Sequence, residues 1–318
     1  MPSKPRRRPQ DEPDGPWDLC IVLTSIAGLL TLSSGSRVTS WGPRSCTTSS
    51  MCLVFVWRAP ADDGEAWEHE LAKRYRLVVA SNRDEILSRP ADRLGRWRDD
   101  EKVIGGRDIA GGGTWLGMTD GGRWSCITNV REPESAPENA PSRGALCANF
   151  LLGDATPEDA ARAAVRDGSR YAGFNAVFGS GEDAWHACNR SGGVVRMPRG
   201  VSVVTNAAPG LDAAWPTAER GRARFAEALR DAADDALVEA LFDVLADGEK
   251  LPLSPTRMPQ AVEDRLCYVC VPPVEVSPNK LWGTRTHTLF LVRADGRVEA
   301  VERNRVDGTD VREEFSIF

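Results

Sequence analysis

A cysteine directly after a methionine is the residue of this sequence best suited to nucleophilic chemistry. Cys52 follows Met51 and precedes an apolar run. Removal of an initiator methionine requires a small second residue, so translation from Met51 would leave Cys52 with a free α-amine. Such an amine has an ordinary pKa of about 7.7–8.0 and can accept the proton of its own thiol. No histidine is needed, and the chain has only three: His69, His186 and His287.

A polar block follows the next apolar segment. Residues 77–80 predict a buried strand, and Asn82, Arg83, Asp84 and Glu85 come after it, at its expected end. At a pocket, the guanidinium would lower the pKa of a cysteine thiol and the carboxylate would hold the α-amine. On the surface, the same pair would be a salt bridge of little energetic value. We interpret the block as part of a site.

Residues 105–117 contain more glycine than a packed helix or strand would carry. This density predicts a loop whose backbone approaches a ligand or another strand closely. The segment is not a phosphate-binding Walker loop, because no Gly-Lys-Ser/Thr follows. It also lacks the strand-to-helix setting of a dinucleotide-binding fingerprint.

Together these segments resemble the NRDE family, which includes the transport and Golgi organisation 2 proteins. The similar blocks occur in the family's order and cover essentially all of residues 51–318; they are residues 51–55, 80–85 with 89–90, 112–117, 127–130, 142–144, 173–175, 205–206 with 215–216, and 283–288. The same order is more distantly similar to the choloylglycine hydrolase and penicillin V acylase branch of N-terminal-nucleophile hydrolases. The resemblance implies an α+β protein with a four-layer αββα fold, in which two mainly antiparallel sheets are flanked by helices.

The resemblance also implies roles for individual residues. Cys52 would be the nucleophile with its α-amine as base, Arg83 and Asp84 would support it, Asn206 would donate to the oxyanion, and Arg285 would order the charges. As alternatives, Asn206 is a turn residue and Arg285 a sheet-edge charge. The further candidates for substrate binding are Asn82, Glu85, Trp115, Asn129 and Asn175, of which Asn129 and Asn175 could equally be hydrogen bonders at strand ends. We expect no metal and no cofactor.

Two functions follow from the resemblance, and a third is independent of it. The first is hydrolysis of a C–N amide or an acyl thioester through an acyl-enzyme at Cys52. The second is non-catalytic carriage of acyl-CoA, another lipid or haem on the same fold, with Cys52 as the one axial haem ligand we can name. The third is a scaffold, which would leave the polar block at residues 82–85 without a role. The expected partner is therefore a small acyl ligand or haem.

The elements expected from apolar patterning are mostly strands. Short β-branched or apolar runs bounded by turn residues predict strands at residues 53–57, 76–80, 124–129, 173–178, 194–197, 201–204, 267–271, 286–292 and 297–302. Ser142 predicts a helix through Phe150, and Thr156 with Pro157 and an acidic third position predicts another. Residues 216–245 predict two helices broken near Asp234.

Composition limits the classes of function. Acidic residues outnumber basic ones, 46 to 40, which argues against general affinity for nucleic acid. Eight scattered cysteines favour reduced thiols over a disulfide scaffold. Cys267 and Cys270 have the spacing of a metal or redox pair, but their apolar surroundings favour a buried strand.

The first fifty residues predict a leader. Basic residues precede an acidic spacer and an apolar run at residues 19–32, which has the length of a signal-peptide core and is short for a membrane span. The acidic spacer is unfavourable for export. We therefore expect residues 1–50 to be disordered or absent from the mature protein, and residues 51–318 to form one cytoplasmic domain without stable membrane insertion; export through residues 1–50 is the alternative.

Overall fold

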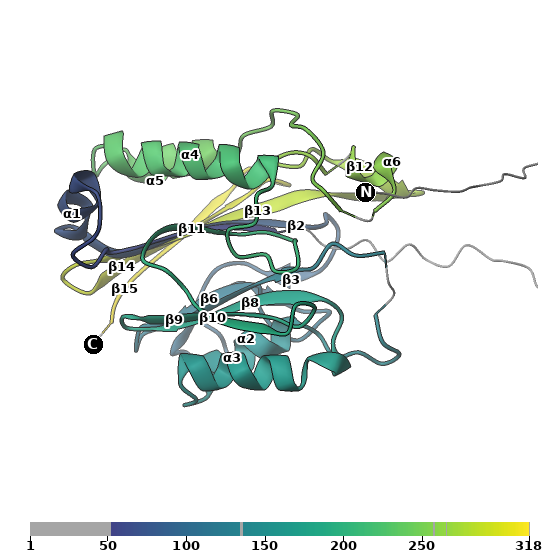
Figure 1. The fold of residues 1–318 in the computed structure, drawn as a ribbon, viewed down its shortest axis with the longest axis horizontal. Helices are drawn as coiled ribbons and strands as arrows, with labels where there is room; N and C mark the ends of the chain where they lie inside the picture. The colour runs from purple at the N-terminus through teal and green to yellow at the C-terminus, as the bar shows by residue number, and fades with distance from the viewer. Residues whose placement is uncertain (1–51, 134–135, 257, 265, 318) are drawn as a thin grey trace, which may run out of the picture. The chain divides into compact units, whose positions relative to one another are not determined.

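The computed structural model describes residues 52–317 except 134–135, 257 and 265 (Figure 1). The leader expected at residues 1–50 lies outside the described residues. Two antiparallel sheets and several helices make up the described part, which confirms the expected α+β class. No helix within the described ranges is long and apolar enough to cross a membrane.

The first sheet carries the cysteine and the polar block. Its strand order is β11-β1-β2-β13-β14-β15, with β12 paired to β13, and all its pairings are antiparallel. The bounds are β1 Cys52–Arg58, β2 Tyr75–Ile86, β11 Gly200–Val204, β12 Val274–Ser277, β13 Lys280–Arg293, β14 Arg297–Asn304 and β15 Asp310–Ser316. Every residue of β1 is buried, as expected for a central strand covered on both faces.

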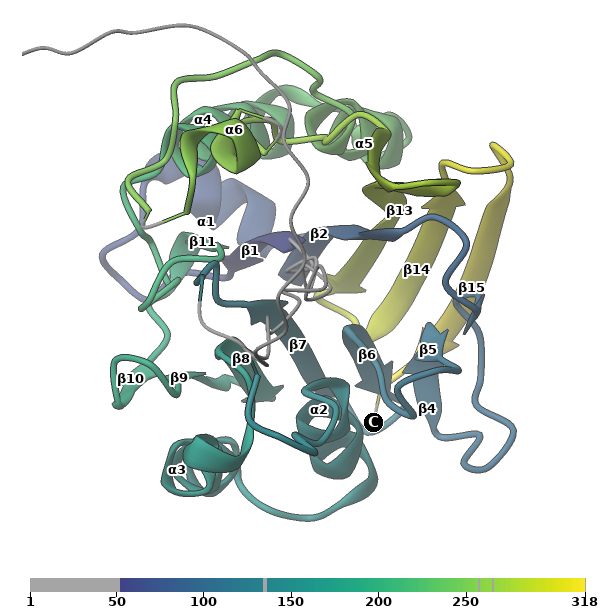
Figure 2. The same ribbon diagram turned by 90° about the vertical axis from the view of Figure 1, so that its right-hand side faces the viewer.

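The second sheet has the order β10-β9-β8-β7-β6-β4, and a small pair, β3-β5, lies apart from both sheets. The bounds are β3 Ala91–Asp92, β4 Val103–Gly105, β5 Arg107–Asp108, β6 Leu116–Thr119, β7 Arg123–Asn129, β8 Phe174–Ser180, β9 Asp183–Cys188 and β10 Gly193–Arg196. Figure 2 shows the two sheets one above the other, seen from the end of the domain.

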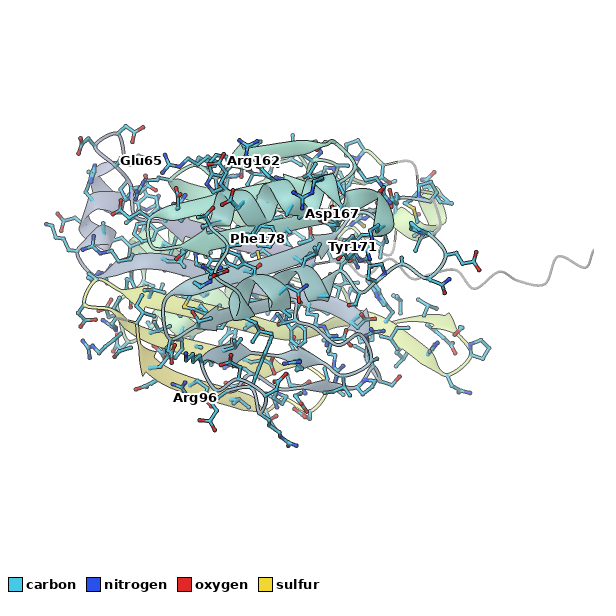
Figure 3. All side chains as sticks on the ribbon, turned by 90° about the horizontal axis from the view of Figure 1, so that it is seen from below. Glu65, Arg96, Arg162, Asp167, Tyr171 and Phe178 are labelled. Atoms are coloured by element: carbon cyan, nitrogen blue, oxygen red, sulfur yellow. The ribbon has the colours of Figure 1, made fainter. Side chains whose placement is uncertain are left out.

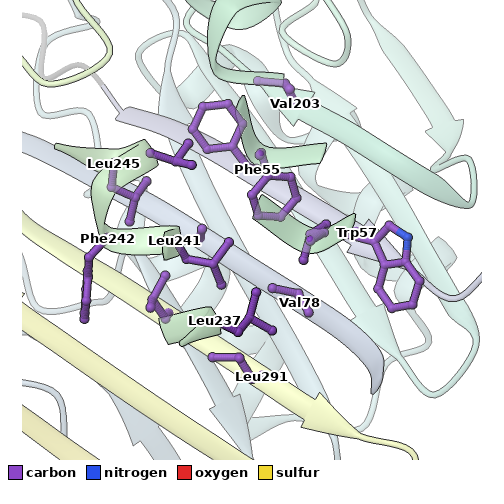
Figure 4. Packing of buried hydrophobic residues seen from close by; sticks show 14 of the residues in the cluster. Phe55, Trp57, Val78, Val203, Leu237, Leu241, Phe242, Leu245 and Leu291 are labelled. Atoms are coloured by element: carbon purple, nitrogen blue, oxygen red, sulfur yellow. The ribbon is translucent and has the colours of Figure 1, made fainter. Parts of the chain in front are cut away.

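Helices cover the outer face of the first sheet. Odd-numbered residues of β1 pack with α4 (Pro216–Asp231) and α5 (Leu237–Leu245), because successive side chains of a strand point to opposite faces. Figure 4 shows Phe55 of the sheet near Leu241 of α5, and Leu291 of the sheet beside Leu237 of the same helix. The apolar stripe predicted for the second half of residues 216–245 is therefore core.

The other face of the first sheet packs on the second sheet. Val54 and Val79 share one apolar cluster with Met118 and Trp124 of β6 and β7. The remaining helices are α1 Ala66–Ala72, α2 Gly144–Leu152, α3 Pro157–Arg166 and α6 Gln260–Glu263, with a short 3-10 helix at Gly168–Arg170. Of these, α2 and α3 cover the outer face of the second sheet, with Arg162 of α3 exposed to solvent (Figure 3).

Most expected elements are present, and one is wrong. The helix at Thr156 is confirmed, and the threonine side chain accepts a hydrogen bond from the Asp159 amide. The break near Asp234 is also confirmed, while the helix predicted from Ser142 begins at Gly144 without a side-chain cap. The elements that were not expected are the strands β3, β4, β5, β6, β9, β12 and β15 and the helices α1 and α6; of these, β5 lies within the segment at residues 105–117 that was predicted as a loop, and β4 and β6 overlap its ends.

Residues 267–271 are buried but do not form the strand that was expected. Their backbone hydrogen bonds go to separate elements: Leu251 donates to the Cys267 carbonyl, Cys270 donates to the Asp247 carbonyl, and Val271 donates to the Thr284 hydroxyl. Apolar composition predicted the burial correctly, since Cys267 is fully buried and Cys270 is 3% exposed. Apolar composition could not show, however, that these residues lack a neighbouring strand with which to form a regular series of backbone hydrogen bonds.

Candidate functional site

Cys52 and Arg83 lie directly opposite each other on neighbouring antiparallel strands. Cys52 begins β1, and its Cα partner in β2 is Arg83. Residues directly opposite in such a pair share a face of the sheet. Val54 and Val56, on the Cys52 face of β1, pack between the two sheets. The strand alternation therefore directs the side chains of Cys52 and Arg83 toward the space between the sheets.

The polar block was expected to follow the end of the strand, but it is part of the strand. β2 runs to Ile86, so Arg83 and Asp84 are consecutive strand residues on opposite faces. The guanidinium thus shares a face with the Cys52 thiol, while the carboxylate belongs to the face covered by helices. Asp84 nevertheless lines the same small cavity as Cys52.

A small cavity lies beside Cys52. Three of the five predicted catalytic residues line it, Cys52, Asp84 and Asn206, together with Leu53, Arg131, Thr205, Trp215, Thr217, Tyr268 and Val269. About 10 Å³ of it is open to the centre of a water molecule, which is room for about one water. Arg83 and Arg285 do not line this cavity.

Burial dominates the electrostatics of the Cys52 thiol. The side chain is 5% exposed, and burial raises the pKa of Cys52 from 9.0 to about 12. The Asp84 charge raises this pKa further, whereas the Asp84 backbone amide and the Arg83 charge lower it. The expected effect of Arg83 on the thiol therefore has the right direction but is smaller than the cost of burying a thiolate.

Arg83 is held by two contacts, and one of its donor nitrogens has no partner among the described residues. Its Nη2 donates to Asp108 Oδ2 at 3.2 Å, and its guanidinium carbon lies 4.0 Å from the centre of the Trp115 ring. The side chain is 4% exposed. Its Nη1 has no hydrogen-bond partner among the described residues. A buried guanidinium N–H without a protein partner is available to a ligand.

The Asp84 carboxyl group accepts a hydrogen bond from the adjacent strand β13. Thr284, its Cα partner, donates its hydroxyl to Asp84 Oδ1 at 2.5 Å. Burial raises the pKa of Asp84 from 3.8 to about 7, while the Thr284 hydroxyl and the charge of Arg131 oppose the rise. The carboxyl group is thus poised to gain or lose a proton near neutral pH.

Asn206 lies in a loop that other buried side chains fix. Its Nδ2 donates to the Asn129 carbonyl at 2.6 Å, and its own carbonyl accepts from the Arg131 amide at 2.7 Å. Asn175 binds the same loop: its Nδ2 donates to the carbonyls of Thr205 and Ala207, and its Oδ1 accepts from the Gly210 amide. Asn175 therefore positions the loop that carries Asn206.

Arg285 occupies an extra position in β13. Thr284 pairs with Asp84 and Thr286 with Arg83, so the register leaves Arg285 as the additional residue of a β-bulge. Its Nη1 donates to the carbonyl of Arg89. Arg285 thus belongs to the charge cluster around Arg83 and Arg89, and is not in direct contact with Cys52.

The other candidate binding residues have separate positions. Glu85 is half-buried and lies 3.7 Å from Arg89 Nε, within the same charge cluster. Trp115 supports Arg83, and its Nε1 has no hydrogen-bond partner in the described part of the chain. Asn82 does not line the cavity: its Nδ2 donates to the carbonyls of Leu245 and Val269, and its Oδ1 contacts His287. Asn129 contributes its carbonyl to Asn206.

Sequence reasoning missed several residues that the fold brings to the site. Asp108 bridges Arg83 and Arg89, and Arg131 pairs with Glu263 at 2.5 Å while it lines the cavity. Arg143 is close enough for its guanidinium to interact electrostatically with Cys52. Arg89 and Arg143 both lie within segments that resemble the NRDE family, which was the available signal. Arg131 gave none, because its pairing with Glu263 depends on the tertiary structure.

Among the described residues, no group of three or more His, Cys, Asp or Glu is placed to hold a metal ion. Cys267 and Cys270 are free thiols in a buried segment. The metal or redox interpretation of this pair therefore gains no support from the surrounding side chains.

Comparisons with known proteins agree with the resemblance found in the sequence. The model of the family Transport and Golgi organisation 2 matches residues 51–307. A Transport and Golgi organization 2 homolog of Mus musculus is 30% identical over 287 residues, which cover 84% of this chain and 98% of the mouse protein. The homolog of Bos taurus is 32% identical over 280 residues, covering 82% and 96%. The homolog of Homo sapiens is 31% identical over 276 residues, covering 81% and 94%. The chain therefore belongs to the Transport and Golgi organisation 2 family.

Proposed function

We propose that this protein is a hydrolase with an N-terminal cysteine nucleophile on a four-layer αββα fold. It cleaves a C–N amide or an acyl thioester through an acyl-enzyme at Cys52. The observation that carries the proposal is the cavity beside Cys52, which Asp84 and Asn206 also line. Residues separated by 32 and 154 positions in the sequence thus meet at one thiol.

The chemistry begins with transfer of the thiol proton to the α-amine of Cys52. The thiolate adds to the substrate carbonyl, and the resulting oxyanion accepts hydrogen bonds, among them one from the Asn206 side chain. Collapse expels an amine or a thiol, which takes the proton from the α-ammonium group, and leaves a thioester on Cys52. Water then adds to this thioester, and its cleavage releases a carboxylic acid and restores the thiol.

The raised pKa of Cys52 makes a local base necessary. With a pKa of about 12, the thiol is protonated near neutral pH unless a neighbouring group accepts the proton. An α-amine exists only when the bond before Cys52 is absent. The proposal therefore requires that functional protein begin at Cys52, which N-terminal sequencing of protein isolated from its host would reveal.

The Arg83 nitrogen without a partner supports a position for the substrate next to this side chain. Arg83 Nη1 is buried and has no partner within the described segments, and it belongs to the residue opposite Cys52. A polar or anionic group of a small acyl substrate would satisfy it. We place this reaction in the cytoplasm, in line with the expectation from the sequence.

A second candidate function is carriage of acyl-CoA, another lipid or haem without cleavage. The observation that favours it is the raised pKa of the Cys52 thiol, because a protonated thiol is a poor nucleophile. A carrier needs only a small side chain at position 52. The two functions therefore predict different consequences of substituting Cys52.

The decisive experiment uses protein whose first residue is Cys52, with Cys52→Ser and Cys52→Ala as variants. Each is incubated with a panel of acyl amides and acyl thioesters, and acyl adducts are sought by intact mass. We expect turnover by the wild type, slow acylation or a stable ester with Cys52→Ser, and no adduct with Cys52→Ala. Absence of turnover by the wild type, with equal binding of acyl-CoA or haem by all three, would exclude the hydrolase and support the carrier.

A further inference from the structure

A second and larger cavity lies at the opposite end of the two sheets. Its volume is about 380 Å³, within the range of cavities that bind small molecules. Arg58 and Leu77, a Cα pair of β1 and β2, line it, whereas Cys52 and Arg83 are the pair at the other end of the same strands. Six residues of extended strand separate the two pairs, or roughly 20 Å at about 3.3 Å per residue. The two cavities have no lining residue in common.

The inner wall of this cavity is apolar. It consists of side chains from both sheets and the chain's last described residue: Leu77, Met118, Trp124, Val292 and Ile317. The first four are less than 9% exposed and belong to the cluster packed between the sheets. A ligand entering between the sheets would therefore meet hydrocarbon and indole surface.

The rim of the cavity is cationic. Arg58, Arg76 and Arg199 line it, and Glu182 is its one acidic residue. The concentration of positive charge is local, because the chain as a whole has a net charge of -6. An anion at this rim would be attracted although the protein is acidic overall.

Two of the three arginines make no ion pair with a carboxylate among the described residues, although the charges of Asp183 and Glu182 act on Arg58 from a distance. Arg58 is 6% exposed, and its guanidinium donates to the carbonyls of Met197, Pro198 and Glu182. Burial lowers the pKa of Arg58 to about 10, which reflects the cost of holding this charge in the fold. Arg76 is exposed, and neither side chain pairs with a carboxylate in the described part of the chain. Arg199, by contrast, pairs with Glu182 at 2.9 Å.

Glycines keep the entrance free of side chains. Gly122 and Gly181 lie in the turns that connect β6 to β7 and β8 to β9, and both line the cavity. Their φ angles are +77° and +55°, in the left-handed region that favours glycine. No atom lies within 4 Å of the position that a Cβ of Gly181 would occupy, so the turn leaves open space there.

We propose that this cavity binds a single-chain amphiphile with one anionic head group. The hydrocarbon chain would pack on the apolar wall, and the head group would accept hydrogen bonds or compensate charge at Arg58 and Arg76. The match of an apolar interior with a rim that carries three arginines and one glutamate defines this class of ligand. The site is independent of Cys52, so it does not depend on the hydrolase proposal.

Calorimetric titration with three ten-carbon probes below their micelle concentrations tests the proposal. Decanoate should bind, decanol should bind about tenfold more weakly because it lacks the charge, and decyltrimethylammonium should not bind detectably. Arg76→Glu should weaken decanoate about tenfold. Arg170→Glu makes the same charge change at an exposed arginine outside the cavity and should leave decanoate binding unchanged.

The position of the bound probe supplies a second measurement. A decanoate analogue with a diazirine at the end of its hydrocarbon chain should label peptides containing Met118, Trp124 or Ile317. The Cys52→Ala variant should be labelled to the same extent as the wild type. Equal affinity for decanoate and decanol, an unchanged affinity of Arg76→Glu, or labelling of peptides that line the Cys52 cavity would each overturn the proposal.

Discussion

The guanidinium of Arg83 stacks on the indole of Trp115, with its carbon 4.0 Å from the ring centre, on the sheet face that also carries the Cys52 thiol. Gly106 makes this stacking possible, because a Cβ at that position would lie 2.2 Å from the Trp115 ring. The position of the Arg83 charge near Cys52 thus depends on an aromatic residue and on a glycine in the segment at residues 105–117.

Gly106→Ala should destabilise the fold by about 1–3 kcal/mol, because the added methyl group forces the Trp115 ring to move. It should also slow Cys52 alkylation, since Arg83 loses its support. Gly95→Ala is the control, because its nearest neighbour to an added Cβ is a carboxylate oxygen at 3.9 Å. Denaturant unfolding and peptide-resolved alkylation measure both effects. An unaltered midpoint for Gly106→Ala would mean that the ring has room to shift.

Arg83→Gln and Asp84→Asn should change the reactivity of Cys52 in opposite directions. The Arg83 charge lowers the pKa of the thiol and the Asp84 charge raises it. Each variant should therefore shift the alkylation rate at a fixed pH below the thiol pKa, roughly tenfold for each unit of pKa. Mass spectrometry of the Cys52 peptide separates this thiol from the other buried cysteines.

Arg285→Gln is the matched control for these two variants, because Arg285 does not line the Cys52 cavity and is not among the main influences on the pKa of Cys52. Its alkylation profile should match that of the wild type. Melting temperatures must be measured in parallel. If Arg83→Gln unfolds more easily while its thiol titrates like the wild type, the arginine has a structural role only.

Asp84→Asn should remove a pH dependence of stability. The pKa of Asp84 is raised from 3.8 to about 7 in the folded protein. Its contribution to stability is therefore complete below pH 3.8, declines as the unfolded chain ionises, and is lost once the pH has risen through about 7. Asparagine cannot ionise and can still accept the Thr284 hydrogen bond. Between pH 4 and pH 8 the wild type should therefore lose unfolding free energy relative to the Asp84→Asn variant. If the difference between the two proteins does not change with pH, the pKa of Asp84 is not raised.

Asn175→Ala and Asn206→Ala should separate positioning from chemistry. Asn175 is fully buried, and its substitution leaves several loop groups unsatisfied, at a cost of about 1–3 kcal/mol. Asn206→Ala should lower stability less, because its side chain makes one hydrogen bond with the described residues. If the protein is a hydrolase, Asn206→Ala should slow acylation by about 2.7–4 kcal/mol in activation free energy. Equal acylation rates for Asn206→Ala and the wild type would remove Asn206 from the oxyanion site.

The sequence by itself determined the class of the fold and much of its local structure. Apolar runs bounded by turn residues identified β1 and β7, and the Thr156 cap identified α3, because these signals depend on neighbouring residues. The order of the resembling blocks identified the family. The same blocks pointed to Cys52, Asp84 and Asn206 as site residues, and these three line one cavity in the structure.

Only the tertiary structure decided what surrounds these residues. The segment at residues 267–271 is apolar like a strand, but its hydrogen-bond partners come from separate elements, which local pattern cannot reveal. The bulge at Arg285 and the continuation of β2 through the polar block depend on register with a strand about 200 residues away in sequence. Most importantly, burial and the Asp84 charge raise the pKa of Cys52, whereas the Arg83 charge lowers it. The extent of burial is a property of the packed structure. The sequence therefore identified Cys52 as the candidate nucleophile, whereas the fold determined how deeply its thiol is buried.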